Sequence, residues 1–321
     1  MLTKDQPLII HSPSDEEPVH ETSGSKDQTT PSTERPITGE EVIRNLFARE
    51  FGNLIIHDPA ARHGRDPEGV HQLRVSARRL RSELKIVKPI MKTSPFKAVQ
   101  GELRWIGSVL GQERDLDVLR ALLKKSSSLT PNGNDAIVSS LDAERKRQRQ
   151  KVTATLASRR YIRLVETLAH HTAAPPLRSS ARECATTILT PNLMILWSDL
   201  YEFVNDAGSA PNDNDLHRIR ILTKQSRYGA EVARMFNPEI SALAPLLARA
   251  QDSLGEIHDS VVAIDYLHSH FKISSSTPSV TSSDIDSLIS DITQAKHAQQ
   301  QLWRQPLEEA RRLIESLRMR P

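Results

Sequence analysis

The chain has 321 residues, of which 37% are hydrophobic but only 4% aromatic, so aliphatic side chains must supply its core. No window approaches the roughly 18 consecutive apolar residues of a membrane span, and the lone Cys184 excludes an intramolecular disulfide. The net charge of +3 conceals an acidic beginning: residues 1–38 hold seven acidic and three basic residues, which leaves +7 on the remainder. With no signal-peptide pattern, we expect a cytoplasmic protein without membrane contact.

Residues 1–37 are rich in Ser, Thr, Pro and acidic side chains, and we predict a disordered acidic arm there. The rest, residues 38–318, has Leu- and Ala-rich segments and no strand patterning, which predicts an all-α domain. A capping box at Thr38 opens a first helix that is expected to end near residues 54–57.

A polar loop is expected next, and the pair Asp66-Pro67 then predicts a new helix start, with a helix running to about Val87. Further helices are expected at about residues 96–110, 113–126, 134–157, 159–172, 178–206, 213–235, 238–255, 257–270 and 283–318. We interpret Cys184, Trp105 and Trp197 as buried packing residues.

Two motifs occur twice, in the same order. VHQLRVSARRLR, with His71, recurs as LHRIRILTKQSR, with His217, and LGQERD, ending at Asp115, recurs as LGEIHD, ending at Asp259. The separation from His71 to Asp115 is 44 positions, and that from His217 to Asp259 is 42. This repetition predicts two homologous half-repeats, residues 38–174 and 177–318.

The first histidine-containing helix is predicted to pack with one side and to present a cationic ridge with the other. At about 100° per residue, five side chains share an arc of roughly 80°. These are His71, Arg74, Arg78, Arg81 and Lys85. The leucines of the helix, Leu73, Leu80 and Leu84, fall on the opposite side.

The second copy places His217, Arg220, Lys224 and Arg227 at the same angles, but Glu231 stands where the first copy has Lys85. A run of charge on a helix is most often a solvated face, in which signs alternate and stabilise each other. Here several cations share one arc in both copies, which favours an anion-binding site. The shorter second ridge predicts that the His71 helix binds more strongly than the His217 helix.

These motifs resemble the CHAD family, the conserved-histidine α-helical domain. The matching stretches are DPEGVHQLRVSARRLRSELK, LRWIGSVLGQERDLDVL, DLHRIRILTKQSRYGAEVA and LARAQDSLGEIHDSVVA. The resemblance covers about residues 38–318. It implies two helical bundles related by a pseudo-two-fold axis with a basic central channel, binding of inorganic polyphosphate, and association with polyphosphate granules.

The resemblance also implies which side chains bind the phosphate chain, and the ridge analysis adds Lys85. The predicted polyphosphate-binding residues are His71, Arg74, Arg78, Arg79, Arg81, Lys85, Arg114, His217, Arg220, Lys224, Arg227 and His258. The sequence departs from the pattern at Gln225, the counterpart of Arg79. Arginine gives bidentate hydrogen bonds to phosphate oxygens and lysine a point charge, so such a row suits a flexible polyanion.

We therefore predict a non-enzymatic polyphosphate-binding protein without cofactor or resident metal. One alternative is a metal-dependent phosphohydrolase or triphosphatase accessory, but the sequence lacks the alternating carboxylates that such chemistry uses. Another is a general polyanion binder, and the scarcity of aromatic residues makes nucleic acid the less favoured ligand.

Histidine and aspartate could hold zinc or manganese, although the surrounding cations oppose a metal ion. We instead expect bound phosphate to raise the pKa of His71 and His217, so that affinity rises as the pH falls. Asp115 and Asp259 could act as general bases, but we interpret them as structural, each helping a helix to restart after a glycine or pairing with a ridge cation.

Overall fold

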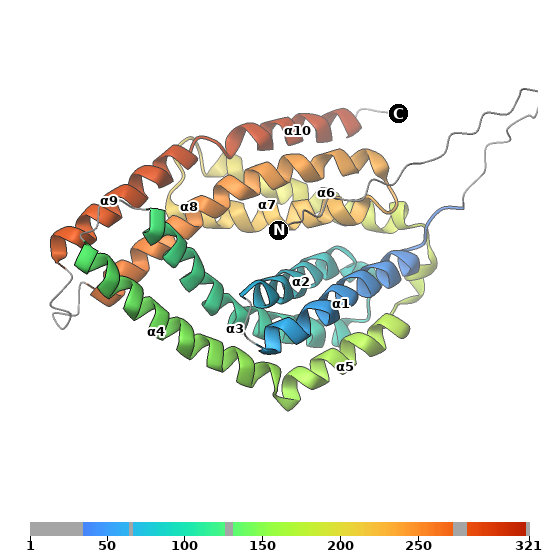
Figure 1. Cartoon of the computed structure of the whole chain (residues 1–321). Helices are drawn as coiled ribbons and strands as arrows, with labels where there is room; N and C mark the ends of the chain where they lie inside the picture. Colours follow the sequence, from blue (N-terminus) through green and yellow to red (C-terminus); the bar gives the residue numbers. More distant parts are fainter. Residues whose placement is uncertain (1–34, 64–66, 126–130, 272–280, 319–321) are drawn as a thin grey trace, which may run out of the picture. The chain divides into compact units, whose positions relative to one another are not determined.

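The computed structural model describes residues 35–63, 67–125, 131–271 and 281–318, which form α-helices joined by short connections (Figure 1). The α-helices are α1 (Gly39–His63), α2 (Pro67–Ile86), α3 (Thr93–Lys125), α4 (Pro131–Leu156), α5 (Arg159–Ala173), α6 (Ala185–Asp206), α7 (Asp213–Ala233), α8 (Leu243–Phe271), α9 (Ser282–Gln299) and α10 (Arg304–Arg318). Short 3-10 helices lie between some of them: η1 (Lys88–Ile90), η2 (Ser179–Arg182) and η3 (Pro238–Ala242). The described residues contain isolated β-bridges but no strand. The predicted all-α class is confirmed, whereas the pseudo-two-fold relation stays a prediction.

The predicted acidic arm lies outside the described residues as far as position 34. Where the described chain begins, the Ile37 carbonyl accepts a hydrogen bond from the Ala185 N–H at 2.8 Å. The predicted capping box is confirmed: a Glu41 carboxylate oxygen accepts from the Thr38 N–H at 2.9 Å, and Thr38 Oγ1 accepts from the Glu41 N–H at 3.3 Å. The next helix, α2, begins at Pro67 as predicted, and its expected N-cap, Asp66, lies outside the described residues.

Helix α1 is longer than predicted, because it continues to His63 through Pro59 where we expected a loop. Proline removes a backbone donor from a helix, yet Ala61 just beyond it is fully buried, so packing compensates for the lost hydrogen bond. This last part of α1 packs closely on the start of α2. A methyl group on Gly69 would lie 2.7 Å from Ala60 Cβ, so only glycine permits the contact.

In two places the structure has one continuous helix where the sequence predicted two shorter helices. We expected a helix end near Gly111 and another near Gly255, but α3 and α8 run straight through them. Both helices extend from the main core into a second hydrophobic cluster, to which α3 contributes Leu119 and α8 contributes Leu267. Burial at both ends outweighs the cost of one interior glycine, which is about 1 kcal/mol. The interpretation of Asp115 and Asp259 as helix-restart residues is therefore wrong.

The core has two parts. The main cluster joins α1, α2, α3, α5, α6, α7, α8 and α10, with residues from the end of α4. The second joins the later turns of α3 and α8 to α4 and α9, on the left side of Figure 1. In the main cluster, the predicted packing face of α2 is confirmed, because Leu73, Leu80 and Leu84 are buried.

The predicted helix over residues 283–318 is instead two helices, α9 and α10. The turn between them contains Trp303, which is buried in the main cluster at 1% exposure. The helix predicted from residue 178 begins only at Ala185, after the short η2.

The three expected packing residues differ in their surroundings. Trp197 is buried as predicted. Trp105 is only partly buried, and the Arg160 guanidinium lies 4.0 Å from the centre of its ring. Cys184 is partly exposed just before α6, so its interpretation as a buried residue is wrong. Among the helices that the model describes, none is long and apolar enough to cross a membrane.

Candidate functional site

The predicted ridges of α2 and α7 meet at one cavity of about 720 Å³, which we call the cationic cavity. Its wall is formed mainly by α2, α7 and α8, with Val118 from α3. The predicted binding residues that line it are His71, Arg74, Arg78, Arg81, Lys85, Arg220, Lys224 and His258. Two helices far apart in the sequence thus bring six Lys and Arg side chains to a single space.

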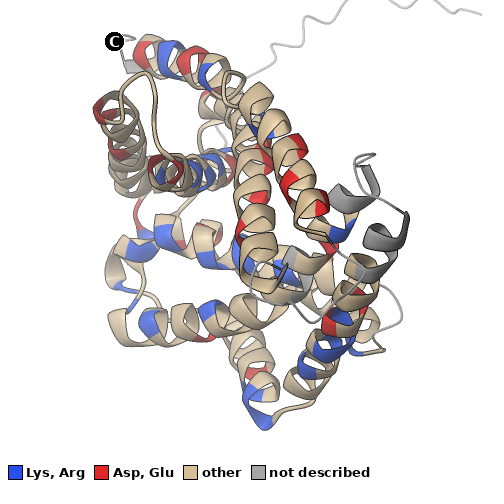
Figure 2. Cartoon of the chain, turned by 90° about the vertical axis from the view of Figure 1, so that its left-hand side faces the viewer, with Lys and Arg blue, Asp and Glu red and all other residues tan. Residues whose placement is uncertain are grey.

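Convergence, rather than a general excess of basic residues, creates this charge. Lys and Arg positions occur along most helices, and Asp and Glu positions lie among them (Figure 2). On α2 the buried leucines fix the rotation of the helix, so its cationic arc faces the cavity. On α7, Ile219 and Leu222 are buried and do the same for Arg220 and Lys224.

Crowding of like charges is strongest at Lys224. Burial, together with Arg220, Arg78 and Arg74, lowers the pKa of Lys224 to about 6, and Asp259 opposes this shift only in part. A buried ammonium group surrounded by cations is destabilised unless an anion is present. At neutral pH the empty cavity therefore holds Lys224 largely in its neutral form, and a bound polyanion would favour its protonation.

The same effect reaches the other end of the α2 ridge. Burial lowers the pKa of Lys85, and the charges of Arg81, Arg104 and Arg218 lower it further. Burial and Arg104 likewise lower the pKa of Arg81. Burial and repulsion between neighbouring positive charges thus disfavour the protonated forms of cavity residues along the whole length of α2. Such lowered pKa values are expected of a site that receives negative charge.

The two histidines of the second repeat lie against each other. His217 Nδ1 is 3.3 Å from His258 Nδ1, so one ring can donate a hydrogen bond to the other. Burial and the charge of Arg220 lower the pKa of His258 to about 4 and also lower that of His217. His258 lines the cationic cavity, whereas both rings line an adjoining smaller cavity of about 190 Å³. His217 is therefore set back from the position that its counterpart, His71, occupies.

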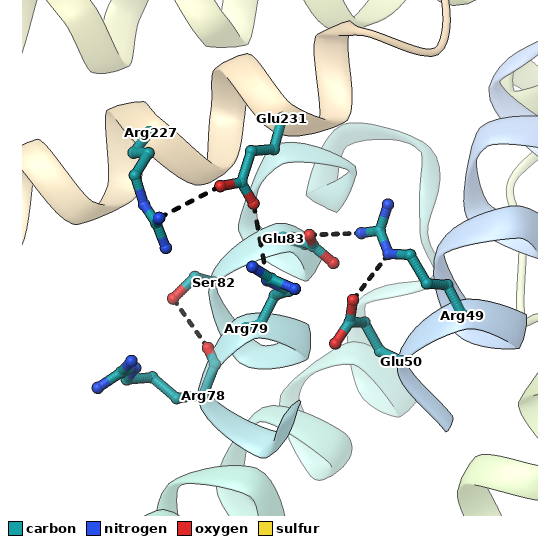
Figure 3. A network of polar contacts seen from close by, with 8 residues as sticks. All are labelled: Arg49, Glu50, Arg78, Arg79, Ser82, Glu83, Arg227 and Glu231. Atoms are coloured by element: carbon teal, nitrogen blue, oxygen red, sulfur yellow. Dashed lines mark hydrogen bonds and ion pairs between the residues drawn. The ribbon is translucent and has the colours of Figure 1, made fainter. Parts of the chain in front are cut away.

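Besides His217, the predicted binding residues Arg79 and Arg227 do not line the cationic cavity. Arg79 and Arg227 both lie beside Glu231, at 3.6 Å and 3.4 Å (Figure 3). Both guanidinium groups also lie over the ring of Tyr228. The wheel placed Arg227 with the ridge but could not show that Glu231, four positions later, draws it away. The predicted place of Arg227 in the second ridge is therefore wrong. Arg79, which was predicted from the family resemblance and not from the ridge, lies outside the wall of the cationic cavity as well.

Arg114 remains a prediction. It belongs to α3, but the side chains of residues 113–115 lie outside the described part of the structure. The motif to which it belongs does approach the ridge, because a methyl group on Gly111 would lie 3.6 Å from Arg74 Nε.

Sequence reasoning predicted only His258 on α8 as a binding residue and missed the rest of this helix's contribution. Beside His258 and Asp259, this helix lines the cavity with Gln251, Asp252, Gly255 and Glu256. Their spacing of three and four residues places them on one helical face, and a wheel drawn through the second Leu-Gly motif would have revealed it. Three carboxylates therefore share the cavity with six Lys and Arg side chains, which moderates its positive charge. Among the described side chains, no group of three His, Cys, Asp or Glu is arranged to hold a metal ion.

A separate acidic network lies on the α1 side of α2 (Figure 3). Arg49 donates hydrogen bonds to Glu50 at 2.7 Å and to Glu83 at 2.5 Å, and both carboxylates are buried. Burial raises the pKa of Glu83 to about 8, and the neighbouring Glu50 contributes to the rise against the opposing charge of Arg49. This network ties α1 to α2 and thereby positions the ridge.

Fold and site together define an all-helical domain with paired basic helices, and comparison with known proteins gives its family. The model of the CHAD domain matches residues 45–268, so the chain belongs to the CHAD domain family. The crystal structure of the CHAD domain from the plant Ricinus communis superposes with a TM-score of 0.71 and 25% identity, covering 85% of this chain and 92% of that one. PptA from Streptomyces chartreusis has a TM-score of 0.67 and 19% identity, covering 86% of this chain and 99% of that one, a likeness of fold alone.

Two curated relatives are the uncharacterized proteins MT2285 and Rv2226 of Mycobacterium tuberculosis. Each is 28% identical over 246 residues, which is 70% of this chain. The chain spans 44% of the length of these relatives.

Proposed function

We propose that the protein binds inorganic polyphosphate in the cationic cavity, without catalysing its hydrolysis. The observation that carries the proposal is the convergence of six Lys and Arg side chains from α2 and α7, which lowers the pKa of Lys224 to about 6. A chain of phosphates carries charge at every unit, so it can contact several of these groups at once. The chain belongs to the CHAD family, and polyphosphate binding is the function that resemblance to this family implies. Family membership therefore supports this choice of anion.

The proposal is tested by titrating labelled long-chain polyphosphate into the wild type and two double variants, Arg74→Ala/Arg78→Ala and Arg220→Ala/Lys224→Ala. We expect each pair to lower affinity at least about tenfold, because each removes two charged contacts. The matched control is Lys92→Ala/Lys97→Ala, which removes two exposed lysines outside the cavity wall. Equal affinity for all four proteins, with their folding intact, would contradict the proposed site.

Two further measurements separate this function from its alternatives. Incubation with tripolyphosphate and Mg²⁺ or Mn²⁺ should release no phosphate, and steady release abolished by Asp259→Asn would indicate a phosphohydrolase. Duplex DNA or RNA at equal charge concentration should displace polyphosphate only weakly, and strong displacement would indicate a general polyanion binder. In cells we propose a cytoplasmic location at polyphosphate granules, which a fluorescent fusion would test.

A further inference from the structure

A second cavity, of about 800 Å³, also carries arginines. It is lined by Arg49, Arg79, Glu231 and Arg234 and by an apolar wall from the chain segment between Met235 and Ala248. Arg234 is exposed, at the end of α7. The molecule therefore has cations in two cavities, and the consecutive residues Arg78 and Arg79 of α2 line one each.

The boundary between these cavities is a cluster around Glu231. Its carboxylate lies 3.6 Å from Arg79 Nε and 3.4 Å from an Arg227 terminal nitrogen (Figure 3). Tyr228, which lines the cationic cavity, packs its buried ring beneath both guanidinium groups, at 5.8 Å for Arg79 and 4.7 Å for Arg227. One carboxylate thus pairs with both Arg79 and Arg227 and offsets part of the positive charge that lies between the two arginine-bearing spaces.

The pairing is electrostatic and leaves donors unused. Both distances exceed those of good hydrogen bonds, and the Nε atoms of Arg79 and Arg227 are buried without a hydrogen-bond partner. The side chains of Arg79, Arg227 and Glu231 are 31%, 17% and 22% exposed, so solvent screens the cluster only in part. Without the negative charge, both arginines would be available to a phosphate oxygen.

Comparison of the two repeat copies shows that an acidic residue at position 231 reverses the charge found in the first copy. The counterpart of Glu231 in the first copy is Lys85, which lines the cationic cavity. A cation or a neutral side chain at position 231 would leave a row of positive charge from Arg78 through Arg79 to Arg234, beside Arg49, which stays paired with Glu50 and Glu83. The acid interrupts that row and would repel an approaching phosphate by direct charge repulsion.

We propose that Glu231 is a specificity-determining residue, which closes the cationic cavity toward the second cavity and thereby limits the length of phosphate chain in contact with the protein. This inference rests on the proposed function. A short chain is held within the cationic cavity in either case, whereas a long chain could continue past Arg79 only if the carboxylate were removed. The second cavity is then a latent extension of the site.

The experiment compares tripolyphosphate with long-chain polyphosphate on four proteins: the wild type, Glu231→Gln, Arg79→Gln and the double variant. Glu231→Gln keeps the shape of the side chain and removes its charge. We expect it to raise affinity for the long chain about tenfold, the effect of one or more added charge-assisted contacts, and to leave tripolyphosphate affinity within about twofold. The salt dependence of long-chain binding should steepen by about one unit or more in log–log slope, because additional cations meet phosphates.

Arg79→Gln gives Arg79 the residue of its counterpart, Gln225, and serves as the matched variant. In the wild-type background it should lower long-chain affinity much less than it does in the Glu231→Gln background, because Glu231 pairs with Arg79. In the double variant it should cancel the gain. An unchanged ratio of long-chain to short-chain affinity in Glu231→Gln would overturn the proposal. So would a loss of long-chain affinity in Arg79→Gln alone that is as large as the gain expected from Glu231→Gln. The second outcome remains decisive if Glu231→Gln fails to fold. Failure of the proposed function would give a different result. In that case the wild type would bind neither tripolyphosphate nor long-chain polyphosphate in a manner that depends on Arg74 and Arg78.

Discussion

The titration of Lys224 makes the proposed binding depend on pH in a defined direction. In the empty cavity the pKa of Lys224 is about 6, mainly because of burial and the charge of Arg220. A bound polyanion favours the ammonium form and raises this pKa toward the ordinary value of about 10.4. Binding between these two values therefore takes up a proton, and affinity must fall as the pH rises.

The size of this pH effect on affinity follows from the fraction of unbound protein in which Lys224 is already protonated. Above the pKa of about 6 in the empty protein, affinity should fall about tenfold for each pH unit. Between pH 6 and 8 the expected total loss is about 50-fold. His258, with a pKa of about 4 in the empty cavity, contributes a further gain in affinity only at lower pH.

The assay is fluorescence anisotropy of end-labelled polyphosphate at fixed ionic strength from pH 5.5 to 8.5. Lys224→Arg is the control, because it keeps a positive charge throughout this range and matches Arg78, its counterpart in the first repeat. Titration of the ligand itself affects both proteins equally. A wild-type affinity that stays constant between pH 6 and 8, or an equal slope in Lys224→Arg, would refute the reasoning.

Three further predictions concern stability. The pKa of Glu83 is raised to about 8, so the folded state binds a proton that the unfolded state releases, and the free energy of unfolding should decrease as the pH rises from about 4.5 to 8. Glu83→Gln should flatten the dependence of Tm on pH in that range. An unchanged dependence would exclude Glu83 as its source. Gly69→Val should destabilise by about 1–3 kcal/mol through its clash with Ala60, measurable as a lower Tm, and wild-type stability would show that the helices can separate freely. Leu80→Ala should cost about 2–5 kcal/mol in urea unfolding because the side chain is fully buried, and a loss under about 1 kcal/mol would contradict the assignment of the α2 packing face.

The helical class and the packing face of α2 could be predicted because they depend on local periodicity. Leu73, Leu80 and Leu84 repeat at helical spacing, and all three are buried. Helix ends were harder, since the glycine at position 111 suggests an end in isolation. Packing of α3 against a second cluster keeps that helix continuous, and this is information from distant parts of the chain.

The same division between local and distant information applies to the site. The ridge residues Arg74 and Arg78 could be identified from one helix alone, and both line the cavity. Arg79 and Arg227 could not be placed, because their positions depend on Glu231, which meets Arg79 only when α2 packs against α7. The carboxylates that α8 brings to the cavity depend in the same way on the approach of a third helix.

Helix α8 lines the cationic cavity with one segment and packs in the second hydrophobic cluster with the next. The number of residues between these two segments is therefore constrained. The helix presents Gln251 and Asp259 to the cationic cavity and, a turn beyond, Ala263 and Leu267 to the second hydrophobic cluster. Inserting or deleting one residue between Asp259 and Ala263 would rotate one segment against the other by about 100°. Either the polar residues would leave the cavity or the apolar residues would leave the cluster. A change in the length of this segment should therefore be tolerated only in steps near a whole helical turn.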